Sequence, residues 1–126
     1  MVPIAGPDDL LAAALAAPAG APLVVAGPPG AGESLGPGWP RALADALAGA
    51  WPRAAPERSP PPVVLVLDCG PAVGLALAVL EDWTAPPGWR LVLTLDPDTH
   101  PAARAALTAR AERVGVMVLA SCAILS

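Results

Sequence analysis

Residues 61–80 read PPVVLVLDCGPAVGLALAVL, and this stretch decides the fold class. Its first apolar run, residues 63–67, has the length of a buried strand, and a polar break at residues 68–70 separates it from a longer apolar run. Pro71 opens the second run, and proline is favoured in the first turn of a helix, so we expect a helix to about residue 81. The stretch therefore predicts a buried strand that leads into a buried helix.

The remainder of the chain alternates between strands and helices in the same way. Apolar runs predict further strands at residues 23–26, 91–95 and 116–119. Helical periodicity and start signals predict further helices at about residues 8–17, 40–51 and 101–113. Strands that alternate with helices favour a parallel sheet with right-handed crossovers.

We therefore expect residues 1–126 to form one small α/β domain with three layers, Rossmann-like or flavodoxin-like. Its sheet is expected to be mostly parallel, with four strands and flanking helices. A fifth strand is added if residues 123–125 form an edge strand instead of packing on a neighbour. Residues 52–62, PRAAPERSPPP, lack periodicity and are predicted to be a Pro-rich internal loop, too short to separate two domains.

The composition favours association with a partner. Apolar residues make up 55% of the chain and charged residues 14%, so charge alone cannot cover the surface. The predicted helix at residues 71–81 is apolar on every side, which indicates deep burial or a contact with another subunit. Trp39, Trp83 and Trp89 fall in predicted loops, where exposed tryptophans often anchor contacts. We expect a homo-oligomer.

The net charge of −4 argues against nucleic-acid binding, because no basic patch is available to neutralise phosphates. A membrane span is not expected either. Residues 61–80 are long enough for one, but Asp68 lies in the middle and a Gly-Pro break follows it. The Ala-rich run at residues 12–17 has no basic segment before it, so no signal peptide is expected.

The cysteine count bears on the compartment. Cys69 and Cys122 are too few for a disulfide framework or a zinc site. Each follows a predicted strand, so the two could be neighbours, but two free thiols in a cytoplasmic protein are the more common case. We expect a cytoplasmic protein without a cofactor.

Residues 23–34, LVVAGPPGAGES, resemble the Walker A motif of P-loop nucleotide-binding proteins, a strand followed by GxxxxGK[ST]. Gly27, Gly32 and Ser34 match the motif, whereas Glu33 stands at the position of its lysine. A carboxylate at that position repels phosphate. The following residues, LGPGWP, are predicted to prevent a helix from starting before about Gly38, although a P-loop opens directly into one. The resemblance thus implies a degenerate P-loop, and no family is recognised over the whole chain.

The polar break after residues 63–67 has two interpretations. Asp68 resembles the end of a Walker B strand, or it caps the following helix. Cys69 lies near the start of that helix, where the macrodipole would lower the pKa of its thiol and favour a nucleophilic thiolate. The simpler interpretation makes Cys69 a small buried apolar side chain.

Residues 95–101, LDPDTHP, contain the single histidine. Asp96, Asp98 and His100 alternate after a predicted strand and could offer two carboxylates and an imidazole to a divalent ion. Alternatively, Asp98 or Thr99 caps the last helix, with His100 solvated beside it.

These candidates share a position in the expected fold. Ligands of parallel sheets bind at the carboxyl edge, where the residues that follow each strand gather. An acidic edge would prefer a cation or an amine to a phosphate. The residues expected there are Glu33, Ser34, Asp68, Cys69, Asp96, Asp98, His100, Ser121 and Cys122.

Two classes of function follow from these observations. The leading hypothesis is a small non-catalytic binding or interaction protein that self-associates. The alternative is an enzyme with Cys69 as nucleophile, or with Asp68, Asp96 and Asp98 around a divalent metal and His100 as acid–base group. Phosphate binding at residues 27–34 is the third and weakest hypothesis.

Overall fold

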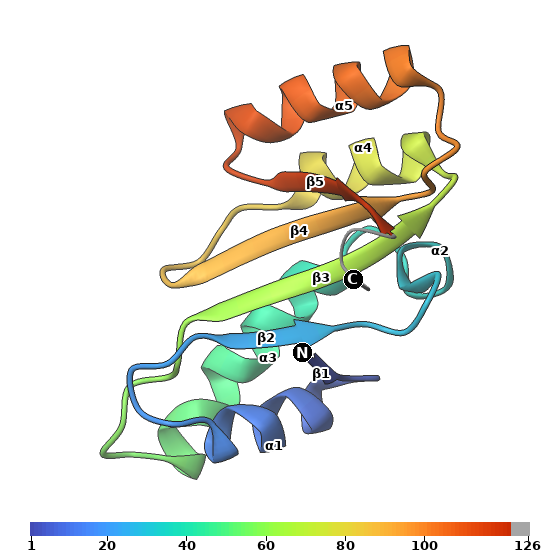
Figure 1. Cartoon of the computed structure of the whole chain (residues 1–126). Helices are drawn as coiled ribbons and strands as arrows, with labels where there is room; N and C mark the ends of the chain where they lie inside the picture. The colour runs from blue at the N-terminus through green and yellow to red at the C-terminus, as the bar shows by residue number, and fades with distance from the viewer. Residues whose placement is uncertain (122–126) are drawn as a thin grey trace.

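The computed structural model describes residues 1–121, which form a five-stranded sheet with helices packed against it (Figure 1). The elements occur in the order β1 (Val2–Pro3), α1 (Pro7–Ala16), β2 (Leu23–Ala26), α2 (Ala31–Leu35), α3 (Trp39–Ala54), β3 (Val63–Gly70), α4 (Val73–Asp82), β4 (Trp89–Leu95), α5 (Pro101–Arg113) and β5 (Met117–Ala120). The predicted α/β class, with a parallel sheet and flanking helices, is confirmed.

All strand pairs are parallel, and the strand order in space, β1-β2-β3-β4-β5, follows the order in the chain. The fifth strand is β1 at the N-terminus, whose two residues are too few to produce a periodic pattern. The expected edge strand at residues 123–125 lies outside the described residues. The strand order could not be read from the sequence, because apolar runs do not specify their neighbours.

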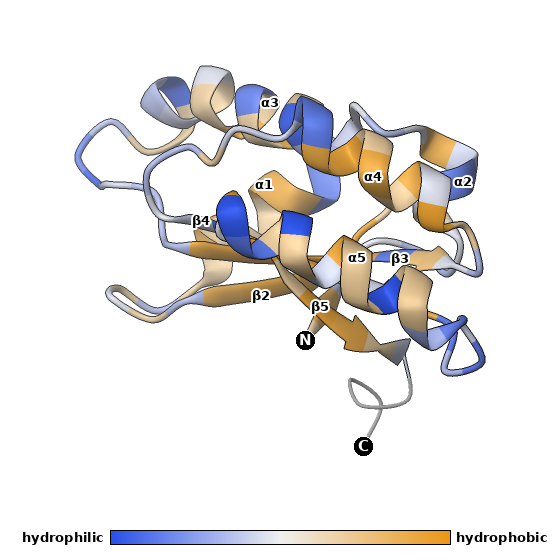
Figure 2. Cartoon of the chain, turned by 90° about the horizontal axis from the view of Figure 1, so that it is seen from above, coloured by the Kyte–Doolittle hydropathy of each residue, from blue (hydrophilic) through white to orange (hydrophobic). Residues whose placement is uncertain are grey.

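The sequential strand order determines where the helices lie. When parallel strands are added in one direction through crossovers of one hand, every crossover helix falls on the same face of the sheet. Figure 2 shows this arrangement, with the helices on one side and the strands on the other. The structure shares the parallel sheet and the βαβ alternation of Rossmann-like domains. No helix of residues 1–121 adds a third layer on the second face.

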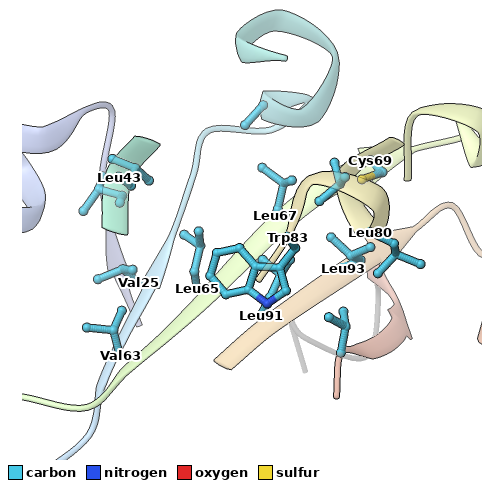
Figure 3. Close-up of a cluster of buried hydrophobic side chains, with 14 of the residues drawn as sticks. Val25, Leu43, Val63, Leu65, Leu67, Cys69, Leu80, Trp83, Leu91 and Leu93 are labelled. Atoms are coloured by element: carbon cyan, nitrogen blue, oxygen red, sulfur yellow. The ribbon is translucent and has the colours of Figure 1, made fainter. Parts of the chain in front are cut away.

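The hydrophobic core lies between the sheet and the helices. On each central strand, alternate residues point into this layer, as period-two side-chain alternation requires. Figure 3 shows part of the resulting cluster, in which strand leucines and valines meet side chains from α3 and α4. The strand residues in the core are Leu23, Val25, Val63, Leu65, Leu67, Cys69, Leu91, Leu93 and Leu95.

The apolar helix and the loop tryptophans, which were expected to expose apolar surface, are mostly part of this core. Helix α4 packs between α2 and α5, and Ala76, Val79 and Leu80 are buried. Its apolar sequence is therefore largely explained within the chain. The predicted exposure of the loop tryptophans is wrong. Trp83 is buried and stacks at a tilt on half-buried Trp89, with 6.2 Å between the ring centroids, and Trp39 is half-buried against the core.

Two helix boundaries differ from those expected. Helix α3 continues to Ala54 and includes Pro52, so the Pro-rich connection begins later than predicted. Buried Trp51 holds this end in place, because its indole Nε1 donates to the carbonyl oxygen of Arg58 (2.7 Å). Helix α2 also begins directly after the Gly-rich loop, where no helix was expected. None of the helices in residues 1–121 has both the length and the apolar character needed to cross a membrane.

Candidate functional site

Asp68 is the most highly connected polar side chain at the carboxyl edge of the sheet. Its Oδ1 accepts hydrogen bonds from the Gly70 N–H (3.1 Å) and the Thr94 hydroxyl (3.0 Å). Its Oδ2 accepts from the Gly30 N–H (2.9 Å). One half-buried carboxylate therefore joins β3, β4 and the loop before α2. Asp68 is not the N-cap of α4, which begins at Val73.

The Gly-rich loop has the strand–loop–helix outline of a P-loop, and the expectation that no helix could follow it is wrong. Gly30 adopts a left-handed conformation (φ 71°) that lets the chain turn into α2 at Ala31. Several backbone N–H groups that a phosphate would need already donate hydrogen bonds to acceptors within the protein. Gly30 donates to Asp68, Ala31 to the Pro28 carbonyl, and both Glu33 and Ser34 to the Gly30 carbonyl. The side chains of Glu33 and Ser34 are exposed.

Cys69 lies on the opposite face of β3 from Asp68, because successive strand residues alternate between faces. Its thiol is only 2% exposed, and burial, with a smaller contribution from the Asp68 charge, raises its pKa from 9.0 to about 12. The predicted lowering of this pKa is wrong. The thiol stays protonated at neutral pH, which fits the simpler interpretation of Cys69 as a buried apolar side chain.

The residues proposed as metal ligands make other contacts in the structure. His100 is the N-cap of α5, and its Nδ1 accepts from the Ala102 N–H (3.2 Å). The capping role predicted for Asp98 or Thr99 thus belongs to the histidine. Arg104 donates to the main-chain carbonyl of Asp96 (2.8 Å). Within residues 1–121, no three His, Cys, Asp or Glu side chains come close enough to hold a metal ion.

A second polar cluster lies at the opposite, amino edge of the sheet. The Arg58 guanidinium stacks over the Trp51 ring, 5.4 Å from its centroid, and its Nη2 donates to the carbonyls of Ala14 and Leu15 (both 3.4 Å). A hollow of about 380 Å³ adjoins it, walled mainly by Ala and Pro residues. The carbonyls are those at the end of α1, so Arg58 stabilises that helix end and holds the Pro-rich connection against it.

The second face of the sheet, here called the uncovered face, was not expected from the sequence, and no helix of residues 1–121 covers it. Val66 and Val92 lie at its centre and are 6% and 9% exposed, yet neither belongs to the cluster between the sheet and the helices. Met117, at its edge, is 54% exposed. The signal was present in the sequence: β3 and β4 are apolar at consecutive positions, as is typical of strands that are buried on both faces.

The strand register arranges the uncovered face in three rows across the sheet. The first row, near the amino edge, contains Val24, Val64 and Arg90. The middle row is entirely apolar, with Pro3, Ala26, Val66, Val92 and Met117. The third row, near the carboxyl edge, contains Asp68, Thr94 and Leu119.

A small hollow opens on this face beside Asp68. It has a volume of about 170 Å³ and is lined by Ala26, Gly27, Pro29, Val66, Asp68, Thr94 and Ser121. Pockets for drug-sized ligands are usually about 300 Å³ or larger. The hollow is therefore large enough for a single side chain rather than for a nucleotide. Of the candidates at the carboxyl edge, only Asp68 and Ser121 line it, and Cys122 lies outside the described residues.

Comparison with known proteins adds no functional assignment. No protein-family model, no curated protein and no solved structure matches the chain significantly.

Proposed function

We propose that this protein is a small non-catalytic interaction protein that self-associates through the uncovered face of its sheet. One observation carries the proposal: a parallel sheet has a largely apolar face on which no helix of residues 1–121 packs. Parallel sheets are almost always covered on both faces, because their crossovers normally supply helices to each side. Here the sequential strand order sends all the helices of residues 1–121 to one side, so a partner would supply the second cover.

The apolar character of the face supports association rather than catalysis. The accessible apolar side chains Val24, Val64, Met117 and Leu119 surround the tightly packed centre of the middle row. Removing such side chains from water stabilises an interface by about 25 cal/mol for each Å² buried. The groups considered for catalysis are dispersed: Cys69 is in the core, His100 caps α5, and Asp68 is held by three hydrogen bonds.

We also propose a cytoplasmic location. The Cys69 thiol is free and buried in the core, which suits a reducing compartment. Fusion to a fluorescent protein and microscopy of the producing cell test the location independently of self-association.

Sedimentation velocity over a range of concentrations tests self-association. We expect a reversible dimer in the parent protein and a dimer at least about tenfold weaker in the Met117→Asp variant, because a charge then enters an apolar interface. Leu35→Asp is the matched control. Leu35 is 41% exposed on the helical side of the molecule, so its substitution adds the same negative charge outside the uncovered face.

Circular dichroism and thermal unfolding must first show that both variants fold. A parent protein that stays monomeric up to its solubility limit contradicts the proposal. Equal weakening of the dimer by Met117→Asp and Leu35→Asp also contradicts it, because the contact would then lie elsewhere.

A further inference from the structure

The uncovered face carries two opposite charges that do not meet within one molecule. Asp68 is half-buried in the third row, and Arg90 is exposed in the first row. The register places Arg90 opposite Val64, four positions before Asp68, which corresponds to about 13 Å along the strand. The one side-chain ion pair within residues 1–121 joins Arg110 and Glu81 (3.7 Å), on other elements.

Removing a carboxylate from water without a cation nearby is costly, and its hydrogen bonds offset only part of that cost. The three donors to Asp68 leave about one of its roughly four acceptor positions unused. The hollow beside Asp68 gives access to this carboxylate from the uncovered face. The site therefore has a space, a negative charge and a remaining acceptor position, and no cationic side chain of residues 1–121 forms an ion pair with it.

We infer that a second copy of this chain supplies the cation, and that its Arg90 enters the hollow beside Asp68. This inference rests on the proposed function and specifies its geometry. The two sheets pack face to face with their strands antiparallel, related by a two-fold axis that crosses the strands at the middle row. Each Arg90 then lies over the third row of the other copy, and the two apolar middle rows face each other.

A second two-fold arrangement brings the two faces together with the axis running along the strands. In that arrangement the first rows face each other, so an axis close to β4 brings the two Arg90 side chains together in the interface while both Asp68 carboxylates remain unpaired. Like charges brought together in a desolvated contact repel each other strongly. Sheets packed face to face are about 10 Å apart, close enough for a long arginine side chain to reach across. The charges on the face thus favour the antiparallel dimer.

The effect of Arg90→Gln on dimer dissociation distinguishes the two arrangements by its sign. In the antiparallel dimer we expect dissociation to become at least about tenfold easier, because the Asp68 carboxylate loses its partner. The salt dependence of association should also weaken, and Arg90→Lys should recover part of the affinity. Arg41→Gln is the matched control, since Arg41 is exposed on α3, away from the sheet.

Three outcomes are separable in the same sedimentation experiment. A parent protein that is strictly monomeric overturns both the proposed function and this inference. A parent dimer that is unchanged or strengthened by Arg90→Gln overturns the inference alone, and strengthening identifies the arrangement with parallel strands. Loss of affinity in Arg90→Gln, with Arg41→Gln unchanged, supports the antiparallel dimer.

Discussion

Asp68 connects parts of the chain that are distant in sequence. Gly30 is 38 positions before it and Thr94 is 26 positions after it, and each donates a hydrogen bond to its carboxylate. A polar residue at the end of a strand can serve as a ligand, a base or a structural acceptor. The hydrogen bonds show that Asp68 is at least a structural acceptor, because it holds the Gly-rich loop against β3 and β4.

Replacing Asp68 by Ala should destabilise the protein by about 2–3 kcal/mol. The substitution removes the acceptor of three hydrogen bonds and leaves partly buried donors on Gly30, Gly70 and Thr94. Urea denaturation measures the change in the free energy of unfolding. Asp45→Ala on the exposed side of α3 is the control and should change it by less than about 0.5 kcal/mol. A similarly small effect for Asp68→Ala would contradict a structural role for these bonds.

The loop before α2 owes its glycines to close packing as well as to backbone conformation. A side chain at Gly27 would place its Cβ 2.7 Å from Cζ3 of Trp39 and 3.1 Å from Cβ of Ala31. Trp39 is the first residue of α3, so this contact sets how closely α3 approaches the end of β2. The resemblance to a nucleotide-binding motif at Gly27 is thus accounted for by packing between two elements.

Gly27→Ala should therefore destabilise the protein by about 1–3 kcal/mol, because the Trp39 ring must move to make room. Gly49→Ala is the opposite case. Gly49 lies inside α3 with nothing within 4 Å of its added Cβ, so alanine should stabilise the helix by up to about 1 kcal/mol. Thermal unfolding of the two variants should give melting temperatures shifted in opposite directions. If Gly27→Ala leaves the melting temperature unchanged, the Trp39 ring adapts to the added methyl group without cost, which contradicts the prediction.

At the scale of the whole molecule, the strand order decides what kind of site is available. Doubly wound folds bind ligands where the strand order reverses, because adjacent loops diverge there and leave a crevice. The sheet described here has no such reversal, since its order follows the chain from β1 to β5. The polar residues at its carboxyl edge consequently serve mainly as caps and connectors. The proposed surface for binding is instead the uncovered face.

Because of the chain's composition, we expect its stability at alkaline pH to depend mainly on one core residue, Cys69. The sequence contains no Lys and no Tyr, so few groups titrate at high pH. The folded protein holds the proton of Cys69 up to a pKa of about 12, whereas an unfolded cysteine loses it near 9.0. Above about pH 9 the unfolded state binds fewer protons than the folded state, so the free energy of unfolding falls as pH rises from about 9 to 12.

This dependence is measured by urea unfolding at a series of pH values, with Cys122→Ser as background to leave a single thiol. We expect the free energy of unfolding to fall by up to about 1.4 kcal/mol per pH unit in this range. Adding Cys69→Ala should remove most of the slope. Equal slopes in the two proteins would contradict the burial of the thiol.

The sequence by itself determined the α/β class and most of the elements. The apolar runs at residues 63–67 and 91–95 are strands, and the run after Pro71 is a helix. These features are local, because strand length, helix starts and periodicity depend on residues that are close in the chain. Only tertiary structure decided the strand order, the placement of the helices on one face and the partners of Asp68. Each of these depends on contacts between segments far apart in the chain, which apolar patterns do not encode.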